Sequence, residues 1–140
     1  LNALLNGVYD LANTQRPADF AFAANDVLTL QKRRALVIIL SNLRDEDDET
    51  LLGAVRQLSR RHRVLVVSLR EPALDNLRQQ PVRSFQDALD YCGTLDYLSA
   101  RGRLHEQLLA HGVPVLDARP HELGPELISR YLAWKKGGVL

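Results

Sequence analysis

The residues best placed for chemistry in this sequence are polar ones at the ends of three short apolar runs. In open α/β sheets, ligands bind in the crevice beyond the carboxyl ends of the strands. If the three runs are strands of one sheet, their polar neighbours meet at that crevice. These candidates are Ser41, Asn42, Ser68, Arg70, Glu71, Asp117 and Arg119.

The residue types in this sequence do not form a catalytic set. The eight glycines are scattered and make neither a dinucleotide-binding fingerprint nor a phosphate loop. Ser68 lacks the small-residue turn that exposes the nucleophile of a hydrolase. Cys92 has helical core spacing with Leu89 and Leu95, which favours a buried structural thiol over a nucleophile. The sequence therefore predicts a chain that is not an enzyme.

Metal binding is not strongly indicated by the residue pattern. The histidines lack the spacing of metal ligands, and we expect exposed or capping roles for His62, His105, His111 and His121. An acidic run from Asp45 to Glu49 follows the first apolar run. Such a run is typical of a helix N-terminus, where acids complement the helix dipole. The alternative is that one of its carboxylates helps to hold a divalent cation.

The three apolar runs predict β-strands from Ala35 to Leu40, from Val64 to Leu69 and from Val113 to Leu116. The first two are almost continuous in Leu, Val and Ile, as in parallel strands that helices cover on both faces. Pro114 cannot donate a ladder hydrogen bond, so the third strand belongs at a sheet edge.

Helical patterns alternate with these strands. One covers about residues 19–32, and a second follows the acidic run. A long helical region begins at Ser84 and ends at Gly112, with Gly93 and Gly102 as points where it is kinked or divided. Its inward residues are expected to be Phe85, Leu89, Cys92, Leu95, Leu98, Leu104 and Leu108. The last helix ends at Gly137, with Leu127, Ile128, Tyr131 and Leu132 inward.

This alternation predicts a three-layer α/β/α, Rossmann-like domain with a mostly parallel sheet of three main strands. A chain of 140 residues suits a single domain. Its formal net charge of +1 disfavours a general nucleic-acid binder. No apolar run approaches the ~20 residues of a membrane-spanning helix. A single cysteine suits a reducing compartment, so we expect a cytoplasmic domain. A parent protein that is anchored to a membrane and carries this domain on the cytoplasmic side is compatible with this expectation.

Four segments resemble one known family. They are residues 34–45 (RALVIILSNLRD), 61–74 (RHRVLVVSLREPAL), 112–120 (GVPVLDARP) and 128–135 (ISRYLAWK). In this order they resemble the family called domain of unknown function fifty-eight. Its members have a von Willebrand A-like domain and are commonly encoded beside AAA+ ATPases of the MoxR class. The resemblance implies that residues 1–140 are the C-terminal portion of such a domain, in a longer parent protein.

The resemblance also implies a degenerate metal site. Von Willebrand A domains bind magnesium with an acidic loop, a hydroxyl from a second loop and an aspartate after a later strand. Here Ala18 stands at the hydroxyl position with Asp19 after it, and Asn42 beside Ser41 replaces the aspartate. Losing a hydroxyl and a carboxylate weakens a hard-cation site. We therefore expect no bound metal or other cofactor at Asp19, Ser41 and Asn42.

Three functional hypotheses follow. The leading one, implied by the resemblance, is a non-catalytic interaction domain that assists a MoxR-class ATPase in chaperone-like complex assembly. Its contact residues would be Asp19, Ser41, Asn42 and Arg70, unless they merely cap strands and helices. The alternative is a small-molecule-binding or hydrolytic α/β enzyme that uses the crevice, with Glu71, Asp117 and Arg119 lining it. The third is a homodimer that pairs the strand edge from Ala35 to Leu40.

Overall fold

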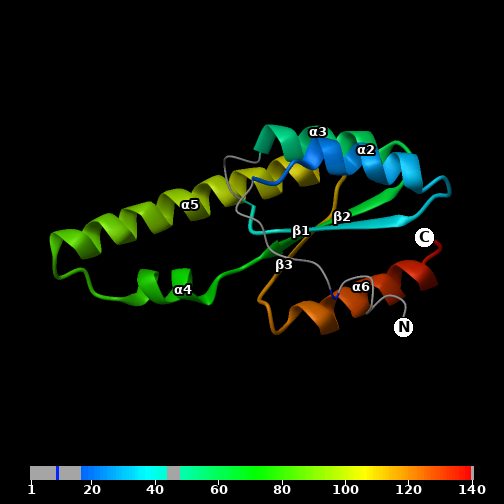
Figure 1. The fold of residues 1–140 in the computed structure, drawn as a ribbon. Helices are drawn as coiled ribbons and strands as arrows, with labels where there is room; N and C mark the ends of the chain where they lie inside the picture. Colours follow the sequence, from blue (N-terminus) through cyan, green and yellow to red (C-terminus); the bar gives the residue numbers. More distant parts are fainter. Residues whose placement is uncertain (1–8, 10–16, 44–47, 140) are drawn as a thin grey trace.

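The computed structural model describes residues 9, 17–43 and 48–139. Its helices and strands alternate along the chain (Figure 1). They are α2 (Phe20–Leu30), β1 (Leu36–Ser41), α3 (Asp48–Ser59), β2 (Arg63–Leu69), α4 (Pro72–Gln79), α5 (Phe85–Ala110), β3 (Val115–Ala118) and α6 (Leu123–Lys136). The predicted α/β fold with a parallel sheet is confirmed.

The sheet has the strand order β1-β2-β3, and both neighbouring pairs are parallel. The central strand β2 is buried on both faces, as its continuous apolar sequence predicts. Its side chains alternate between two cores: Val64 and Val66 lie in one, and Leu65 and Val67 lie in the other. Pro114 directly precedes β3, and β3 lies at the sheet edge as predicted.

Helices cover both faces of the sheet, which gives three layers (Figure 1). On one face α2, α3 and the second half of α5 form the larger core, with Leu51, Val55, Leu104 and Leu108 buried in it. On the other face α6 packs with Leu123, Leu127 and Trp134 against the sheet. The expectation of helices on both faces is therefore met for the described residues.

The strand β1 is less buried than its apolar sequence predicts. Most of its side chains are half-buried, and that of Leu40 is 50% exposed. The reason is its place in the sheet, because β1 pairs only with β2 among the described strands. Along its other side no described strand provides ladder partners.

The long helix α5 differs from the prediction in two ways. It runs through Gly93 and Gly102 as one helix of 26 residues, without division. Its first half extends past the sheet and lies beside α4, a short helix that the sequence analysis did not identify (Figure 1). The predicted inward positions of this half, Phe85, Leu89, Cys92 and Leu95, are consequently exposed. The prediction of a buried Cys92 is wrong.

The last helix is likewise rotated relative to the prediction. Leu127 is half-buried against the sheet, but Ile128, Tyr131 and Leu132 are exposed. The helix instead packs through Trp134, whose ring lies 5.3 Å from the Arg63 guanidinium. A periodic apolar pattern with residues on several faces does not by itself decide which of these faces the sheet covers.

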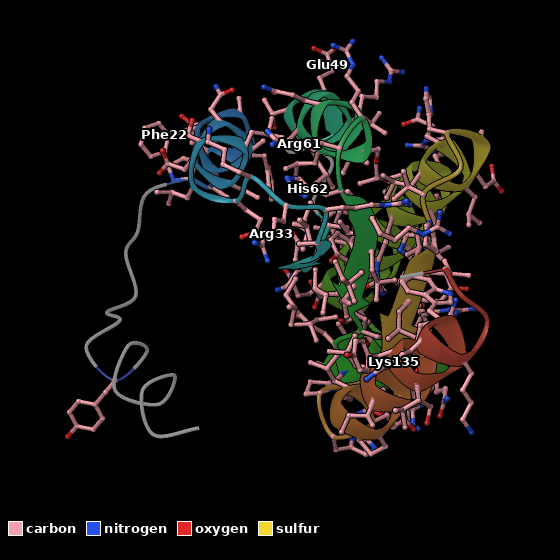
Figure 2. The ribbon with its side chains drawn as sticks, turned by 90° about the vertical axis from the view of Figure 1, so that its right-hand side faces the viewer. Phe22, Arg33, Glu49, Arg61, His62 and Lys135 are labelled. Carbon is pink, nitrogen blue, oxygen red and sulfur yellow. The ribbon has the colours of Figure 1, made fainter. Side chains whose placement is uncertain are left out.

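His62 is buried, 3% exposed, which contradicts the expected exposed or capping role (Figure 2). Its Nδ1 accepts the backbone N–H of Ala35 at 3.3 Å, so the ring joins the start of β2 to the start of β1. His111 and His121 are exposed as predicted, whereas His105 is half-buried.

Candidate functional site

The carboxyl ends of the strands bring three predicted site residues into one row. In the parallel register Ser41 lies opposite Ser68, and Ser68 lies opposite Asp117. Because α2 leads back into β1, the start of α2 with Asp19 also lies at this end of the molecule (Figure 1). The sequence therefore located this end of the sheet correctly from the apolar runs alone.

The polar groups at the end of β1 form local hydrogen bonds. Ser41 Oγ accepts the backbone N–H of Leu43 at 3.1 Å. The Asn42 side chain donates to Glu71 Oε1 at 3.0 Å, and the Asn42 carbonyl accepts the hydroxyl of Tyr97 at 2.9 Å. These contacts tie the loop after β1 to α5 and to the residue before α4. They stabilise the fold, and a partner-binding role for Ser41 and Asn42 stays a prediction.

Asp19 caps a helix. Its Oδ1 accepts the backbone N–H of Phe22 at 2.8 Å, in the first turn of α2. This bond satisfies one of the free N–H groups of a helix start. The side chain is exposed nevertheless, so a second role at this end of the sheet is sterically open.

Arg101 is the residue that sequence reasoning missed most clearly. It lies on α5, is only 5% exposed, and donates from Nε to Ser68 Oγ at 2.8 Å. Its Nη2 donates to the same hydroxyl and to Asp117. A signal was present: Arg101 has i, i+3 and i, i+7 spacing with Leu104 and Leu108, which places a charge on the buried face of the helix.

His105 lies on α5 one turn after Arg101, and its Nε2 is buried without a hydrogen-bond partner among the described residues. Burial lowers the pKa of His105, the positive charge of Arg101 lowers it further, and Asp117 opposes these effects. The folded chain therefore binds this proton less tightly than the unfolded chain does. Folding stability should consequently fall as the pH drops below the ordinary histidine pKa of about 6.5.

We therefore expect His105→Gln to remove part of this acid sensitivity. Urea unfolding at about pH 7.5 and about pH 5.5, on either side of the ordinary histidine pKa, measures it. The stability lost between the two pH values should be smaller in the variant. An equal loss in both proteins would show that His105 does not carry the effect.

A cavity of about 320 Å³ opens where α4 and α5 meet the sheet, and is lined by Arg70, Asp75, Arg78, Gln79, Tyr91 and Arg119. Asp75 forms a salt bridge with Arg70 at 2.6 Å and a longer one with Arg119 at 3.6 Å. The hydrogen bond from Arg70 lowers the pKa of Asp75, and the same contact raises the pKa of Arg70. Arg70, a predicted site residue, thus pairs with Asp75, which the sequence analysis did not identify.

The residues proposed for an enzymatic crevice do not come together. Of Glu71, Asp117 and Arg119, only Arg119 lines this cavity. Glu71 accepts from Asn42, and Asp117 accepts from the buried Arg101. In the described part of the chain, no group of three His, Cys, Asp or Glu side chains is arranged to hold a metal ion. The acidic run lies mostly outside the described residues, and α3 begins within it, at Asp48.

An exposed apolar stripe lies on the part of α5 that projects past the sheet. Phe85, Leu89 and Cys92 have i, i+4 and i, i+7 spacing and share one helix face. The exposed fraction is 80% for Phe85 and 51% for Leu89, and Cys92 is exposed as well. We call these three residues the α5 stripe. Apolar surface grouped in this way is typical of a protein-binding face.

Comparison of the chain with protein-family models, with characterised proteins and with solved structures finds no match. None of the helices that the structure describes is both long and apolar enough to span a bilayer.

Proposed function

We propose that this chain is a non-catalytic protein-interaction domain that binds its partner with the carboxyl end of the sheet and the projecting half of α5. The partner that the resemblance implies is a MoxR-class AAA+ ATPase, in chaperone-like complex assembly. The von Willebrand A-like assignment belongs to the same proposal. The observation that carries the interaction role is the α5 stripe.

The stripe suits a protein partner for a physical reason. Leaving a phenylalanine and a leucine in water forfeits about 1.5–3 kcal/mol of burial for each side chain. A partner that covers Phe85 and Leu89 recovers this free energy. The carboxyl end of the sheet offers charged side chains of the cavity, including Arg70 and Arg119, as a second and polar contact region for the same partner. Asn42, at the end of β1, adjoins this second region through its hydrogen bond to Glu71, the neighbour of Arg70.

The double substitution Phe85→Ser/Leu89→Ser tests this role. Immobilised wild-type chain should bind the purified MoxR-class ATPase encoded beside the parent gene, measured by biolayer interferometry. The variant should weaken the dissociation constant at least about tenfold, the equivalent of 1.4 kcal/mol. Because both side chains are exposed, the free energy of unfolding should change little.

Leu109→Ser is the matched control, since Leu109 is 58% exposed near the other end of the same helix. Its binding should equal that of the wild type. The proposal is wrong if the wild-type chain does not bind the ATPase, or if the control and the stripe variant lose affinity equally. A loss of affinity for the ATPase in the double variant Asn42→Ala/Arg70→Ala would extend the interface to these two predicted contact residues.

A second candidate function, binding of a small molecule, rests on the cavity around Asp75. Its volume of about 320 Å³ is at the lower end of ligand pockets. The shifted pKa values of Arg70 and Asp75 have a structural cause, because the two side chains pair with each other. Perturbed groups that already neutralise one another are weak indicators of catalysis. We therefore rank this function second.

Self-association through β1 is the third proposal. The outer side of β1 has no described strand beside it, and Leu40 is half exposed. A second copy could add its own edge from Ala35 to Leu40 there. A molar mass that stays monomeric at all concentrations in light scattering would refute this pairing.

A further inference from the structure

Basic side chains gather at the end of the molecule opposite to the proposed partner surface. Because the strands are parallel, β1 and β2 both begin there, and α2, α3 and α6 end there. The residues are Arg33, Arg34, Arg60, Arg61, Arg63, Lys135 and Lys136, and Figure 2 labels Arg33, Arg61 and Lys135 among them. Part of this pattern has a simple cause, because bases near helix C-termini complement the helix dipole.

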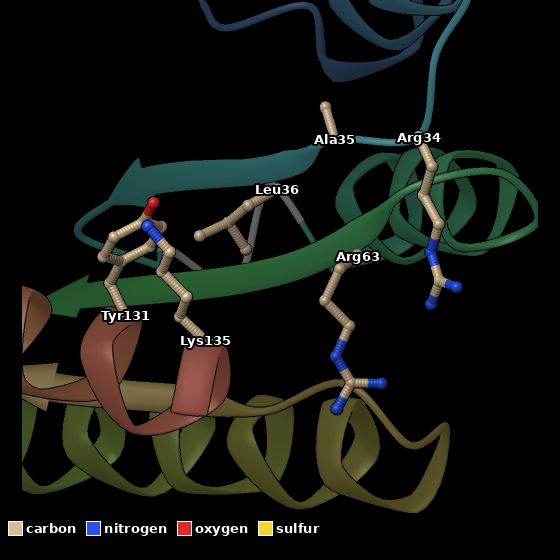
Figure 3. Close-up of a pocket in the computed structure, with 6 residues that line it drawn as sticks. All are labelled: Arg34, Ala35, Leu36, Arg63, Tyr131 and Lys135. Carbon is tan, nitrogen blue, oxygen red and sulfur yellow. The ribbon is translucent and has the colours of Figure 1, made fainter. Parts of the chain in front are cut away.

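Three of these side chains do more than flank a helix end. A cavity of about 340 Å³ is lined by Arg34, Ala35, Leu36, Arg63, Tyr131 and Lys135 (Figure 3). Arg34 precedes β1, Arg63 begins β2, and Lys135 lies in the last turn of α6. Three separate elements thus each contribute one positive charge to the same hollow.

These charges are not neutralised within the described part of the chain. None of Arg34, Arg63 and Lys135 forms a salt bridge with a described carboxylate. No acidic side chain lines this cavity, whereas Asp75 offsets the arginines of the cavity at the carboxyl end. Figure 3 shows the three charged ends at different sides of the hollow, with Lys135 beside Tyr131 and the two guanidinium groups farther along. Together they give the hollow a positive potential that attracts an anion.

The cavity also has one restrained cation and an apolar wall. The Arg63 guanidinium lies over the Trp134 ring, and this stacking limits its movement. Ala35, Leu36 and the ring of Tyr131 supply apolar surface, and the Tyr131 hydroxyl is an additional donor. Figure 3 shows Tyr131 and Lys135 reaching from α6 toward β1.

We infer that this cavity is a binding site for a small organic phosphate, an anion that carries a phosphate monoester on an apolar body. The positive potential of the three cations attracts a doubly charged phosphate, and a single guanidinium group can match two of its oxygens in bidentate geometry. The apolar wall would contact the body of the ligand. A nucleic-acid strand fits less well, because Arg63 and Arg130 both lie over the Trp134 ring, on which a base would stack. This site is independent of the proposed partner.

Isothermal titration calorimetry with phenyl phosphate at low salt tests the site. The double substitution Arg34→Gln/Lys135→Gln should weaken binding at least about tenfold. The control Arg33→Gln/Lys136→Gln removes the same charge at the neighbouring positions, which do not line the cavity. It should keep the affinity within about twofold. Fluorescence of Trp134, the single tryptophan, should report binding independently because it lies beneath Arg63.

Two further ligands define the specificity. Inorganic phosphate should bind more weakly than phenyl phosphate, because it lacks the apolar body. Equal loss of affinity in both double variants would show diffuse attraction and overturn the site. The site would also be overturned if the wild-type chain did not bind phenyl phosphate at about 10 mM. Binding to phosphatidic acid vesicles without binding to free phenyl phosphate would assign the patch to a lipid surface and overturn the small-molecule site.

Discussion

Replacing Asp117 by alanine should lower the free energy of unfolding by about 3 kcal/mol. The carboxylate itself is 39% exposed, but its partner Arg101 is only 5% exposed and would keep its charge inside the protein. After the substitution, the hydroxyl of Ser68 is the remaining side-chain partner of that guanidinium among the described residues. A buried charge without a counter-ion is among the costliest defects in a fold.

The companion substitution Arg101→Met should cost only about 1 kcal/mol. It removes the buried charge and replaces it with an apolar chain of similar length, and the cost comes from the Ser68 hydroxyl that loses its donor. Urea unfolding followed by Trp134 fluorescence measures both variants. In the double variant, Asp117→Ala should add little to Arg101→Met, because the unpaired charge is gone. Additive losses would show that the two side chains do not act as a pair.

Truncation of Leu43 to alanine should cost about 3 kcal/mol, because its side chain is 1% exposed in the larger core. Leu43 also has a φ of 51°, in the left-handed region that residues with a Cβ avoid. Leu43→Gly loses the same buried side chain but relieves this strain. We expect the glycine variant to be more stable than the alanine variant by roughly 0.5–1 kcal/mol.

This order is the reverse of the one expected in a helix, which supplies the control. At Leu58, buried on α3, alanine should be more stable than glycine by about 1 kcal/mol. Chemical unfolding of the four variants measures both differences. If alanine is also the better residue at position 43, the backbone there is not strained. The strain matters for the candidate partner surface, because the turn at Leu43 sets the direction of Asn42, which contacts Glu71 and Tyr97.

The local features of this chain could be predicted from its sequence. Continuous apolar runs specified the parallel strands β1 and β2, and the burial of β2 on both faces, although β1 is only half-buried. Ser84 and Asp87 form the reciprocal capping box that begins α5, and Gly112 after its end has the left-handed φ of 72°. Each of these signals depends only on residues that are close together in the sequence. The sequence alone is therefore enough to recognise it.

What the sequence left open was decided by contacts between distant segments. The spacing of Phe85, Leu89 and Cys92 specified one helix face, but only the tertiary fold carries that half of α5 past the sheet, where nothing described covers it. Pairing of Arg101 with Ser68, 33 residues away, requires α5 to cross beside β2. Helical periodicity gives the direction of a side chain around the helix axis, whereas its burial depends on which other element of the fold packs against that face. The sequence therefore determined the elements and their order, and the tertiary structure decided which faces, charges and cavities they share.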